Sequence, residues 1–493
     1  PNNCAMPEVF GLDAYAPRVD AGGRVMCGIV LRASSAAFDP ARWVEAFPGL
    51  AVEARSGRVV EARVPAASLR ELAARAEVEH VGLRPRPAPL ARSEGLDGMR
   101  APDFWPRFGR GEGVRIAVLD VGFSGYHRLL GGDLPSDVKV RSFYRTDLGG
   151  TDIGGDGESH GTACAEIVHD VAPEAELYLA NAGSLGELEQ AVDWLVEEGV
   201  EVISHSIGWP AGIGDGSGPV ADLVASARAR GVVWVNAAGN FARANWSGEW
   251  RDEDGDGISE VGDGGTEAIF LPPASAGAQI FVWLLWDEWP VSTGLSFEVD
   301  LVDAEGRWLA SSEYDWGGSP YAFRPLSFRP TAYTTGLRLQ IRSGRGDPEG
   351  RRLRIVRLDN DLAEESRVEA GSLAIPADSP DAISVGAYNW RDDERESFSS
   401  YGPTLAGVAK PEIMGPDGVQ TATTRAGAPP SDFYGTSAAC PHVAGAVALL
   451  LGAGVRGGLF DSRFGPAEIA ELLRREAAPL AGTPSLPSME GWG

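Results

Sequence analysis

This chain is organised around the stretch Gly435-Thr436-Ser437-Ala438-Ala439-Cys440-Pro441-His442-Val443-Ala444-Gly445-Ala446. The stretch predicts a tight turn followed by a small-residue apolar helix, with Ser437 at the helix N-terminus and Pro441 in the first turn. A helix N-terminus carries about half a positive charge and several unpaired N–H groups. A serine there can attack a carbonyl group while those N–H groups receive the oxyanion. The alternative is a buried helix whose serine only caps it.

The composition is acidic, because 43 Lys and Arg residues face 70 Asp and Glu residues, and the 493-residue chain has a formal net charge of −27. This charge argues against nucleic acid or an anionic membrane as a partner. No apolar run is expected to be long enough to span a bilayer. No basic-then-apolar leader is visible, so we expect that a signal peptide was removed or never present. Four cysteines make no disulfide framework here, although Cys4 and Cys27 could pair, which would imply an oxidising compartment.

The N-terminal part predicts a small α+β unit at residues 24–90, after an irregular segment at 1–23. Apolar runs predict strands, and amphipathic runs predict helices, in the order β-α-β-α-β. The strands are expected at 25–31, 59–64 and 78–83, and the helices at 40–47 and 66–75. The unit ends in the proline-rich stretch 84–90, which is typical of an extended linker.

An α/β pattern follows at residues 91–245 and returns at 372–480. Short, continuously apolar strands alternate with helices, which predicts a mostly parallel sheet covered on both faces. The strands are expected at 114–119, 177–179, 200–204, 232–235 and 382–387, and the helices at 185–198 and 221–230. Such sheets carry their functional groups at the carboxyl ends of the strands. Asp120 and Asn240 both follow such ends.

Residues 246–371 have a different texture. Stretches with a period of two residues predict strands at 280–286, 295–302, 326–328, 337–341 and 353–358, with no convincing helix between them. This pattern favours an all-β sandwich that is inserted into the α/β domain. The tail at 481–493 is rich in proline and glycine and is expected to be loose.

His160 stands in Ser159-His160-Gly161-Thr162-Ala163-Cys164-Ala165, which predicts a second small-residue helix. A lone histidine before a helix is more often structural. Here, however, an aspartate at a strand end, a histidine at a helix start and a serine at a helix start follow one another along the chain. The order Asp120, His160, Ser437 is one of the known orders of a catalytic triad.

The motifs together resemble those of the subtilisin-like serine proteases. The matching stretches are Val118-Leu119-Asp120, His160-Gly161-Thr162, Ser206-Ile207-Gly208, Ala237-Ala238-Gly239-Asn240, Phe398-Ser399-Ser400-Tyr401-Gly402-Pro403 and Gly435-Thr436-Ser437 with Pro441-His442-Val443-Ala444-Gly445. The resemblance implies a three-layer α/β sandwich with a mostly parallel sheet. It also implies a hydrolase that cleaves protein or peptide substrates through an acyl-enzyme, without a catalytic metal.

The resemblance assigns a role to each matching residue. Ser437 attacks the scissile carbonyl, His160 takes and returns its proton, and Asp120 holds the imidazole. Asn240 and the N–H of Ser437 bind the oxyanion. The substrate is expected along Ser206, Ile207 and Gly208 on one side of the S1 pocket and Ala237, Ala238 and Gly239 on the other. Cys164 and Cys440 lie one turn beyond His160 and Ser437 and are expected to be buried thiols, the alternative being a disulfide beneath the site.

The flanking parts also resemble those of secreted subtilases. Residues 24–90 resemble an inhibitory propeptide that is cleaved from its own protease somewhere in 84–100, the alternative being an unrelated α+β adaptor. The inserted sandwich resembles modules that accompany secreted relatives, and we expect it to reshape the substrate cleft. These features favour a secreted zymogen.

A short acidic loop opens the insertion. Asp252, Asp254 and Asp256 occupy positions 1, 3 and 5 of a calcium-loop pattern, with Gly257 at position 6. Ile258 would offer its carbonyl and Asp263 would stand at position 12. The sequence therefore predicts a structural calcium site, the alternative being a solvated acidic turn.

The sequence as a whole is best interpreted as a secreted subtilisin-like endopeptidase. Two other functions stay open: a catalytically silent binding scaffold that keeps the fold, and an intracellular processing protease. A silent relative is expected to lack a triad residue or the oxyanion asparagine, and all four are present. The preferred substrate side chain and the oligomeric state are not readable from the sequence.

Overall fold

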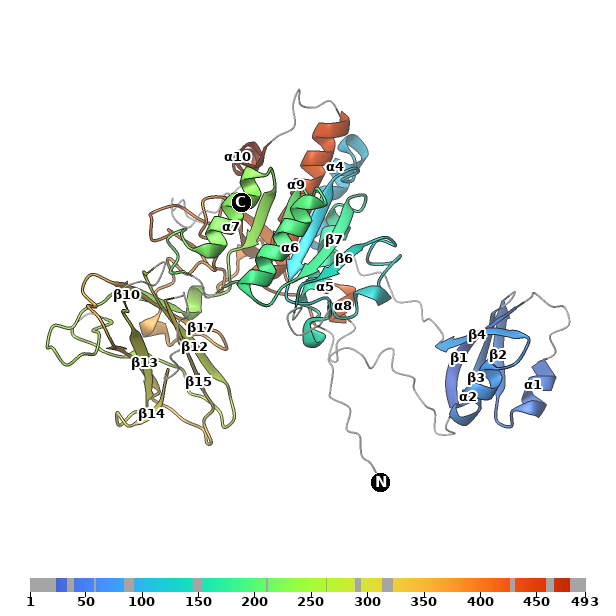
Figure 1. Ribbon diagram of the computed structural model, residues 1–493, viewed down its shortest axis with the longest axis horizontal. Helices are drawn as coiled ribbons and strands as arrows, with labels where there is room; N and C mark the ends of the chain where they lie inside the picture. The colour runs from blue at the N-terminus through green and yellow to red at the C-terminus, as the bar shows by residue number, and fades with distance from the viewer. Residues whose placement is uncertain are drawn as a thin grey trace. The chain divides into compact units, whose positions relative to one another are not determined.

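The computed structural model divides the chain into two compact units (Figure 1). It describes residues 24–32, 40–56, 59–83, 93–144, 153–209, 212–262, 264–288, 294–312, 322–425, 431–457 and 465–478. The first unit spans Pro1–Leu90 and takes in Ala426–Pro430, and the second comprises the rest of the chain.

The first unit contains a four-stranded antiparallel sheet in the order β2-β3-β1-β4. Its elements are β1 (Arg24–Leu31), α1 (Pro40–Ala46), β2 (Ala51–Ser56), β3 (Val59–Pro65), α2 (Leu69–Ala73) and β4 (Val78–Leu83). Alternate apolar residues of β1 and β3, such as Ile29 and Val60, share one core with Trp43 and Leu72 of the helices. The predicted β-α-β-α-β order was wrong because it lacked β2. That edge strand carries Glu53 and Arg55, so it shows no apolar run.

The second unit is built on a sheet in the order β19-β18-β9-β8-β5-β7-β6, with β20 beside β18. All of its pairs are parallel except that of β18 with β19. The strands are β5 (Arg115–Asp120), β6 (Lys139–Ser142), β7 (Glu176–Asn181), β8 (Val202–His205), β9 (Val233–Ala237), β18 (Ala382–Asn389), β19 (Glu394–Arg395) and β20 (Ile413–Asp417). The predicted α/β class and the mostly parallel sheet are confirmed.

Helices cover both faces of this sheet, which explains the continuously apolar strands. In β5, Ile116 and Val118 share a core with α5 (His160–Val171) and α9 (Thr436–Gly457). Their neighbours Ala117 and Leu119 share the opposite core with α6 (Leu185–Glu197) and α7 (Pro219–Ala229). Successive side chains of a strand point to opposite faces, so both sets must be apolar. The remaining helices of the unit are α3 (Gly95–Gly98), α4 (Ala101–Phe108), α8 (Ala422–Arg425) and α10 (Pro466–Glu476).

Helix α9 corrects two expectations. Its stretch Thr436–Gly454 has a mean hydropathy of 1.5 and is long enough to cross a membrane, contrary to the expectation that no such run exists. However, 78% of this stretch is buried inside the protein, as is typical of a helix at the centre of a globular core. The helix begins at Thr436, so Pro441 lies in its second turn rather than in the first.

The inserted region is a sandwich of two antiparallel sheets, in the orders β10-β17-β12-β15 and β11-β16-β13-β14. Its strands are β10 (Asn245–Glu249), β11 (Ile269–Phe270), β12 (Ile280–Trp286), β13 (Phe297–Val302), β14 (Trp308–Ser311), β15 (Phe323–Phe328), β16 (Arg338–Ser343) and β17 (Arg352–Arg357). Buried residues of both sheets, such as Trp286 and Phe297, form one core together with Trp250, which follows β10. β10 and β17 pair with each other, so both ends of the insertion leave it side by side.

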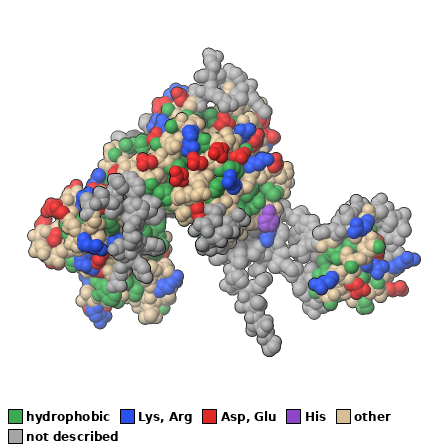
Figure 2. Space-filling view, in the orientation of Figure 1, with side chains coloured by type: hydrophobic (Ala, Val, Ile, Leu, Met, Phe, Trp, Pro, Cys, Tyr) green, Lys and Arg blue, Asp and Glu red, His purple; other side chains and the backbone are tan. Residues whose placement is uncertain are grey.

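The excess of negative charge does not gather in one patch on the visible surface. Figure 2 shows acidic and basic side chains interspersed over the visible face of the second unit.

Candidate active site

Asp120 and His160 meet at the carboxyl edge of the parallel sheet. Asp120 is the last residue of β5 and is fully buried, and His160 is the first residue of α5. Nδ1 of His160 lies 2.9 Å from each carboxylate oxygen, and Oδ1 also accepts a hydrogen bond of 2.8 Å from the Val121 N–H. The carboxylate therefore holds the proton of the imidazole on Nδ1, which leaves Nε2 free to accept another.

This geometry also changes the basicity of His160. Burial would lower the pKa of the imidazole, but the charge and hydrogen bonds of Asp120, with a smaller contribution from Glu158, outweigh it. The net pKa is raised above its ordinary value of 6.5. A base with a pKa raised in this way accepts a proton more readily near neutral pH.

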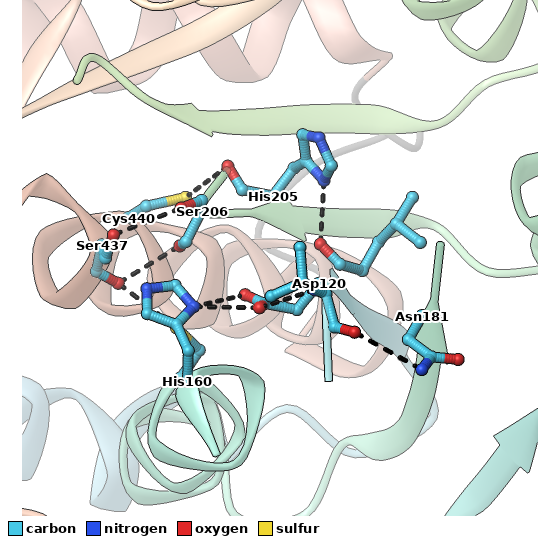
Figure 3. A network of polar contacts seen from close by, with 10 residues as sticks. Asp120, His160, Asn181, His205, Ser206, Ser437 and Cys440 are labelled. Atoms are coloured by element: carbon cyan, nitrogen blue, oxygen red, sulfur yellow. Dashed lines mark hydrogen bonds and ion pairs between the residues drawn. The ribbon is translucent and has the colours of Figure 1, made fainter. Parts of the chain in front are cut away.

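Ser437 lies on the other side of the imidazole, near the start of α9 (Figure 3). Its hydroxyl donates to the Ser206 carbonyl at 3.2 Å. Pro441 has no N–H to give to the Ser437 carbonyl four residues earlier. That carbonyl instead accepts from Oγ of Ser206 at 3.2 Å and Sγ of Cys164 at 3.5 Å. The proline thus frees a carbonyl that ties the helix start to α5 and to Ser206, the residue that follows β8.

Asn240 is held by the turn that precedes Ser437. Its Oδ1 accepts from both the N–H and the Oγ1 of Thr436, each at 2.9 Å, and Oγ1 accepts in turn from the Gly239 N–H at 3.1 Å. Because Oδ1 is used in this way, the amide must present Nδ2 as its donor. Gly435 has φ +112°, and a Cβ there would lie 2.9 Å from Nδ2, so glycine is required at this position.

Replacing Thr436 with valine is expected to lower kcat about tenfold with little change in KM. The loss of the hydroxyl removes one of the two hydrogen bonds that orient Asn240, worth about 1.4 kcal/mol. Steady-state kinetics on a peptide anilide measure the effect, and Thr436→Ser, which keeps the hydroxyl, is the matched control. An equal loss in the serine variant would contradict the argument.

The residues expected to line the substrate fall into two groups. Ala237, Ala238 and Gly239 are buried and lie next to Ala374, whose N–H donates to the Ala238 carbonyl at 2.7 Å. Ser206 is buried beneath Ser437, whereas Ile207 is partly exposed and Gly208 is exposed. Of the six, Ile207 and Gly208 are thus the most accessible to a substrate.

The sandwich reaches this part of the site. A recess of about 270 Å³, a volume that includes open solvent, is lined by Gly208 and Ala374 of the catalytic domain and by Trp283, Leu285 and Val356 of the sandwich, among others. A Cβ on Gly208 would lie 3.2 Å from that of Ala374. The floor between the two substrate-lining segments is therefore closed by an alanine and backed by the insertion.

Two further histidines support the site without taking part in it. His205 and His442 are fully buried, and burial lowers the pKa of each to about 4. Nδ1 of His205 lies 2.8 Å from the carbonyl of Leu119, the residue before Asp120. Nδ1 of His442 lies 2.7 Å from the Ala438 carbonyl. A pKa of about 4 leaves both rings uncharged near neutral pH, and their contacts with backbone carbonyls give them a structural role.

Cys164 and Cys440 are free, buried thiols, as expected. Burial raises the pKa of Cys440 to about 11 and that of Cys164 well above its ordinary value, so both stay protonated at neutral pH. The disulfide between them that the sequence left open is not formed. The suggested pairing of Cys4 with Cys27 depends on Cys4, which lies outside the described residues.

The acidic loop brings its three carboxylates together. Ligand oxygens of Asp252, Asp254 and Asp256 all lie within 4.8 Å of one another. Backbone N–H groups of the loop donate to each of them, including that of Ile258 to Oδ1 of Asp256 at 2.8 Å. Asp263 lies outside the described residues.

Sequence reasoning missed three groups of the site: Thr436, the hydroxyl of Ser206 and the ring of Phe433. The Phe433 ring packs edge-on against the His160 imidazole, with centroids 5.6 Å apart. Thr436 and Ser206 lie within motifs quoted above, so their positions indicated that they are near the site. Their roles were not predictable, because the hydrogen bonds that define them join segments far apart in the chain.

Comparisons with known proteins agree with this geometry. The sequence model of the Subtilase family matches residues 111–267 and 356–493, which together are more than half of the chain. The first range includes Asp120, His160 and Asn240, and the second includes Ser437.

Three curated relatives illustrate the likeness in sequence. Alkaline elastase YaB of Bacillus sp. (strain YaB) is 30% identical over 166 residues, which are 31% of this chain and 40% of the relative. The major intracellular serine protease of Bacillus subtilis (strain 168) is 29% identical over 163 residues, 30% of this chain and 49% of the relative. Subtilisin Savinase of Lederbergia lenta is 30% identical over 161 residues, which are 30% of this chain and 55% of the relative. The chain thus spans about half the length of the curated relatives it matches.

A solved structure extends the likeness in fold. The Clostridium perfringens CspB protease is similar with a TM-score of 0.55 and 20% sequence identity, over 81% of this chain and 95% of that one. This share exceeds the part matched by the family model, so the likeness in fold reaches beyond the two catalytic segments.

Proposed function

The chain belongs to the subtilase family, and on this premise we propose that it is a serine endopeptidase that hydrolyses peptide bonds in proteins. The observation that carries the proposal is the buried Asp120 carboxylate 2.9 Å from Nδ1 of His160, with Ser437 on the far side of the ring. The oriented amide of Asn240 supports it, because a scaffold without activity has no need of an aligned oxyanion donor.

In the first half of the reaction, Oγ of Ser437 attacks the scissile carbonyl carbon. Nε2 of His160 takes the hydroxyl proton, and the buried Asp120 stabilises the imidazolium that forms. The oxyanion is received by Nδ2 of Asn240 and the N–H of Ser437. The imidazolium then gives the proton to the leaving amine, the C–N bond breaks, and an acyl-enzyme on Ser437 remains.

In the second half, water replaces the amine. His160 takes a proton from the water as its oxygen attacks the acyl carbon, and the same donors hold the second oxyanion. When the C–O bond to Ser437 breaks, the imidazolium returns its proton to Oγ, so the free enzyme is restored.

The first unit is proposed to be the enzyme's own inhibitory propeptide, and the protein to be a secreted zymogen. The described part of this unit is an independent α+β fold with its own core, and the proline-rich stretch 84–90 follows it. Ser93 marks the point from which the second unit is anchored: its N–H donates to Asp170 at 2.7 Å and its hydroxyl lies 2.6 Å from Nε2 of His442. We therefore place the processing site upstream of Ser93.

The inserted sandwich is proposed to limit the depth of the S1 pocket. Trp283 and Leu285 line the recess that Gly208 and Ala374 also line. We therefore expect the S1 pocket to accept a small substrate side chain at P1, next to the scissile bond. Peptide preference measured with a series of P1 residues tests this role, and a preference for large aromatic residues would contradict it.

The acidic loop is proposed to bind one structural calcium ion through Asp252, Asp254 and Asp256. Three carboxylates in close reach suit a hard cation with oxygen ligands. Glu260, eight residues after Asp252, is buried, and its Oε2 has no hydrogen-bond partner among the described residues. This oxygen is therefore available as a further ligand of the ion. The ion would offset the repulsion between the carboxylates and fix the loop at the start of the sandwich.

Removal of calcium is therefore expected to lower the unfolding temperature of the protein. If calcium is present at about 100 times its dissociation constant, it contributes about 2.7 kcal/mol. Differential scanning calorimetry with and without a chelator measures the shift, using Ser437→Ala to prevent autolysis. Asp254→Asn is expected to abolish the response, with Asp347→Asn, in another acidic turn of the sandwich, as the matched control. A response that persists in Asp254→Asn would place the ion elsewhere.

The proposed activity is tested by intact mass spectrometry with a serine-directed fluorophosphonate. The unchanged chain is expected to gain one label and to lose the residues upstream of Ser93, whereas Ser437→Ala should do neither. Labelling without cleavage would still support the proposed peptidase activity, and it would indicate that the first unit is a stable inhibitor or an adaptor. If neither labelling nor cleavage occurs, the chain is a silent scaffold.

A further inference from the structure

Two acidic residues lie behind the turn that precedes Ser437. Asp417 is the last residue of β20 and is fully buried. Its Oδ2 accepts a hydrogen bond of 2.9 Å from the N–H of Gly435. Its Oδ1 is buried and has no hydrogen-bond partner among the described residues when both carboxyl groups are taken as acceptors.

The group that faces Asp417 is another carboxyl. Asn389 of β18 pairs with Asp417 of β20, and its Nδ2 donates to Oε1 of Glu396 at 3.0 Å, which brings the Glu396 carboxyl beside Asp417. Two carboxylates have only lone pairs to offer, so they repel each other and cannot form a hydrogen bond. A single proton between them turns the repulsion into an O–H···O bond and satisfies the unpartnered Oδ1.

We propose that Asp417 and Glu396 share one proton, and that the resulting hydrogen bond positions the Gly435 turn and, through it, Asn240 and Ser437. The pair does not touch the reacting atoms, so both are positioning residues. The positioning part of this inference rests on the proposed peptidase function, while the shared proton does not.

Among the described residues, the cation that acts on Asp417 is engaged by other groups as well. Arg391, on the turn after β18, is the positive group that acts on Asp417. Its guanidinium is already bonded to the Gly418 carbonyl at 2.9 Å and to Asp432 at 2.7 Å, with Tyr434 and Glu94 also acting on it. Burial raises the pKa of Asp417 most, the Gly435 N–H opposes this effect and Glu396 adds to it, giving a pKa of about 7.

The path from the pair to the site is short. The Gly435 N–H is fixed by Asp417, and the next N–H, that of Thr436, is bonded to Oδ1 of Asn240. Ser437 follows directly. A carboxyl pair that loses its proton repels, and the bond from the Gly435 N–H to Asp417 transmits this movement to the turn before Ser437.

The sign of the pH effect follows from linkage. In the unfolded chain the Asp417 carboxyl ionises near its ordinary value of 3.8, whereas in the native chain it does so near 7. Between these values the native state holds a proton that the unfolded state has lost, so a rise in pH favours unfolding by up to tenfold per unit. Above pH 7 both states are ionised and the effect levels off.

The test compares Asp417→Asn and Glu396→Gln with the parent chain, all in the Ser437→Ala background. Each amide supplies a permanent N–H in place of the shared proton and keeps the other hydrogen bonds. Urea unfolding is measured from pH 5 to pH 9. The ratio of the unfolding constant of the parent to that of either amide variant is expected to rise about 50-fold between pH 5 and pH 7. Contributions from other titrating groups, such as Glu166 and Asp378, cancel in this ratio. A ratio that does not change with pH overturns the shared proton.

The positioning role is tested in the active enzyme. The parent is expected to lose kcat/KM on the alkaline side of its optimum, and both amide variants should flatten this loss. Asp417→Ala removes the anchor of Gly435 and should lower kcat about tenfold with KM unchanged, whereas Asp417→Asn restores kcat. Parallel pH profiles in parent and amide variants would overturn the positioning role. If no variant labels with the fluorophosphonate, the proposed function and the positioning role both fail, while the unfolding comparison still decides whether the proton is shared.

Discussion

Asp120→Asn is expected to lower kcat by about 10⁴, a magnitude known from well-studied serine proteases rather than obtained from this structure. In the native site, Oδ1 of Asp120 accepts from the Val121 N–H at 2.8 Å, and both oxygens face Nδ1 of His160. An asparagine that keeps its oxygen on the Val121 N–H must turn its NH₂ group toward Nδ1. The imidazole then carries its proton on Nε2 and cannot accept the proton of Ser437.

This prediction is checked by kcat on a peptide anilide near pH 8 and by the rate of fluorophosphonate labelling, both of which should fall together. Ser437→Ala gives the background from contaminating proteases. The variant should fold, because Asn occupies the same volume and keeps the Val121 bond. A loss smaller than tenfold would show that Asp120 does not fix the tautomer of His160.

Asn240→Ala is expected to lower kcat by 10² to 10³, about 3–4 kcal/mol of transition-state stabilisation, as measured for a subtilisin, a relative of this chain. Asn240 is exposed at the site, and its Oδ1 accepts hydrogen bonds from Thr436. The substitution therefore removes Nδ2 as an oxyanion donor, and the Ser437 N–H remains as the other donor. KM should change little, because the donor acts mainly on charge that develops in the transition state.

Steady-state kinetics separate this effect from a disturbance of the turn. The Thr436→Val variant keeps the Asn240 amide and loses only one of its anchors, so its loss should be about one tenth of that in Asn240→Ala or less. Similar losses in both variants would mean that the turn, and not the amide, stabilises the oxyanion.

Much of the fold was predictable from local patterns. The continuous apolar runs of β5, β8 and β9 predicted a parallel sheet with both faces covered, since a strand buried on two sides needs apolar residues at every position. Edge strands were harder to predict. β2, with Glu53 and Arg55, and β6, the partly exposed Lys139–Ser142, carry polar residues because each is an edge strand among the strands that the structure describes.

Some residues of the site were likewise predictable from local patterns, and others were not. Asp120, His160, Asn240 and Ser437 each stand at the end of a strand or the start of a helix within a short motif, so their identity could be predicted residue by residue. Asp417 could not be, because nothing in its neighbourhood along the chain links it to Gly435 or Glu396. The first-turn position expected for Pro441 was wrong because the start of α9 depends on bonds from Thr436 to Asn240, almost 200 residues away.

The sequence by itself therefore determined the family, the α/β class and the four residues proposed to carry out the chemistry, because these depend on side-chain type and on position within short motifs. Only the tertiary structure decided which atom of the Asn240 amide is held, which groups replace the missing N–H of Pro441 and which carboxyls face each other behind the nucleophile. Hydrogen bonds and buried charges depend on distances between segments that lie far apart in the chain, and local patterns carry no information about those distances.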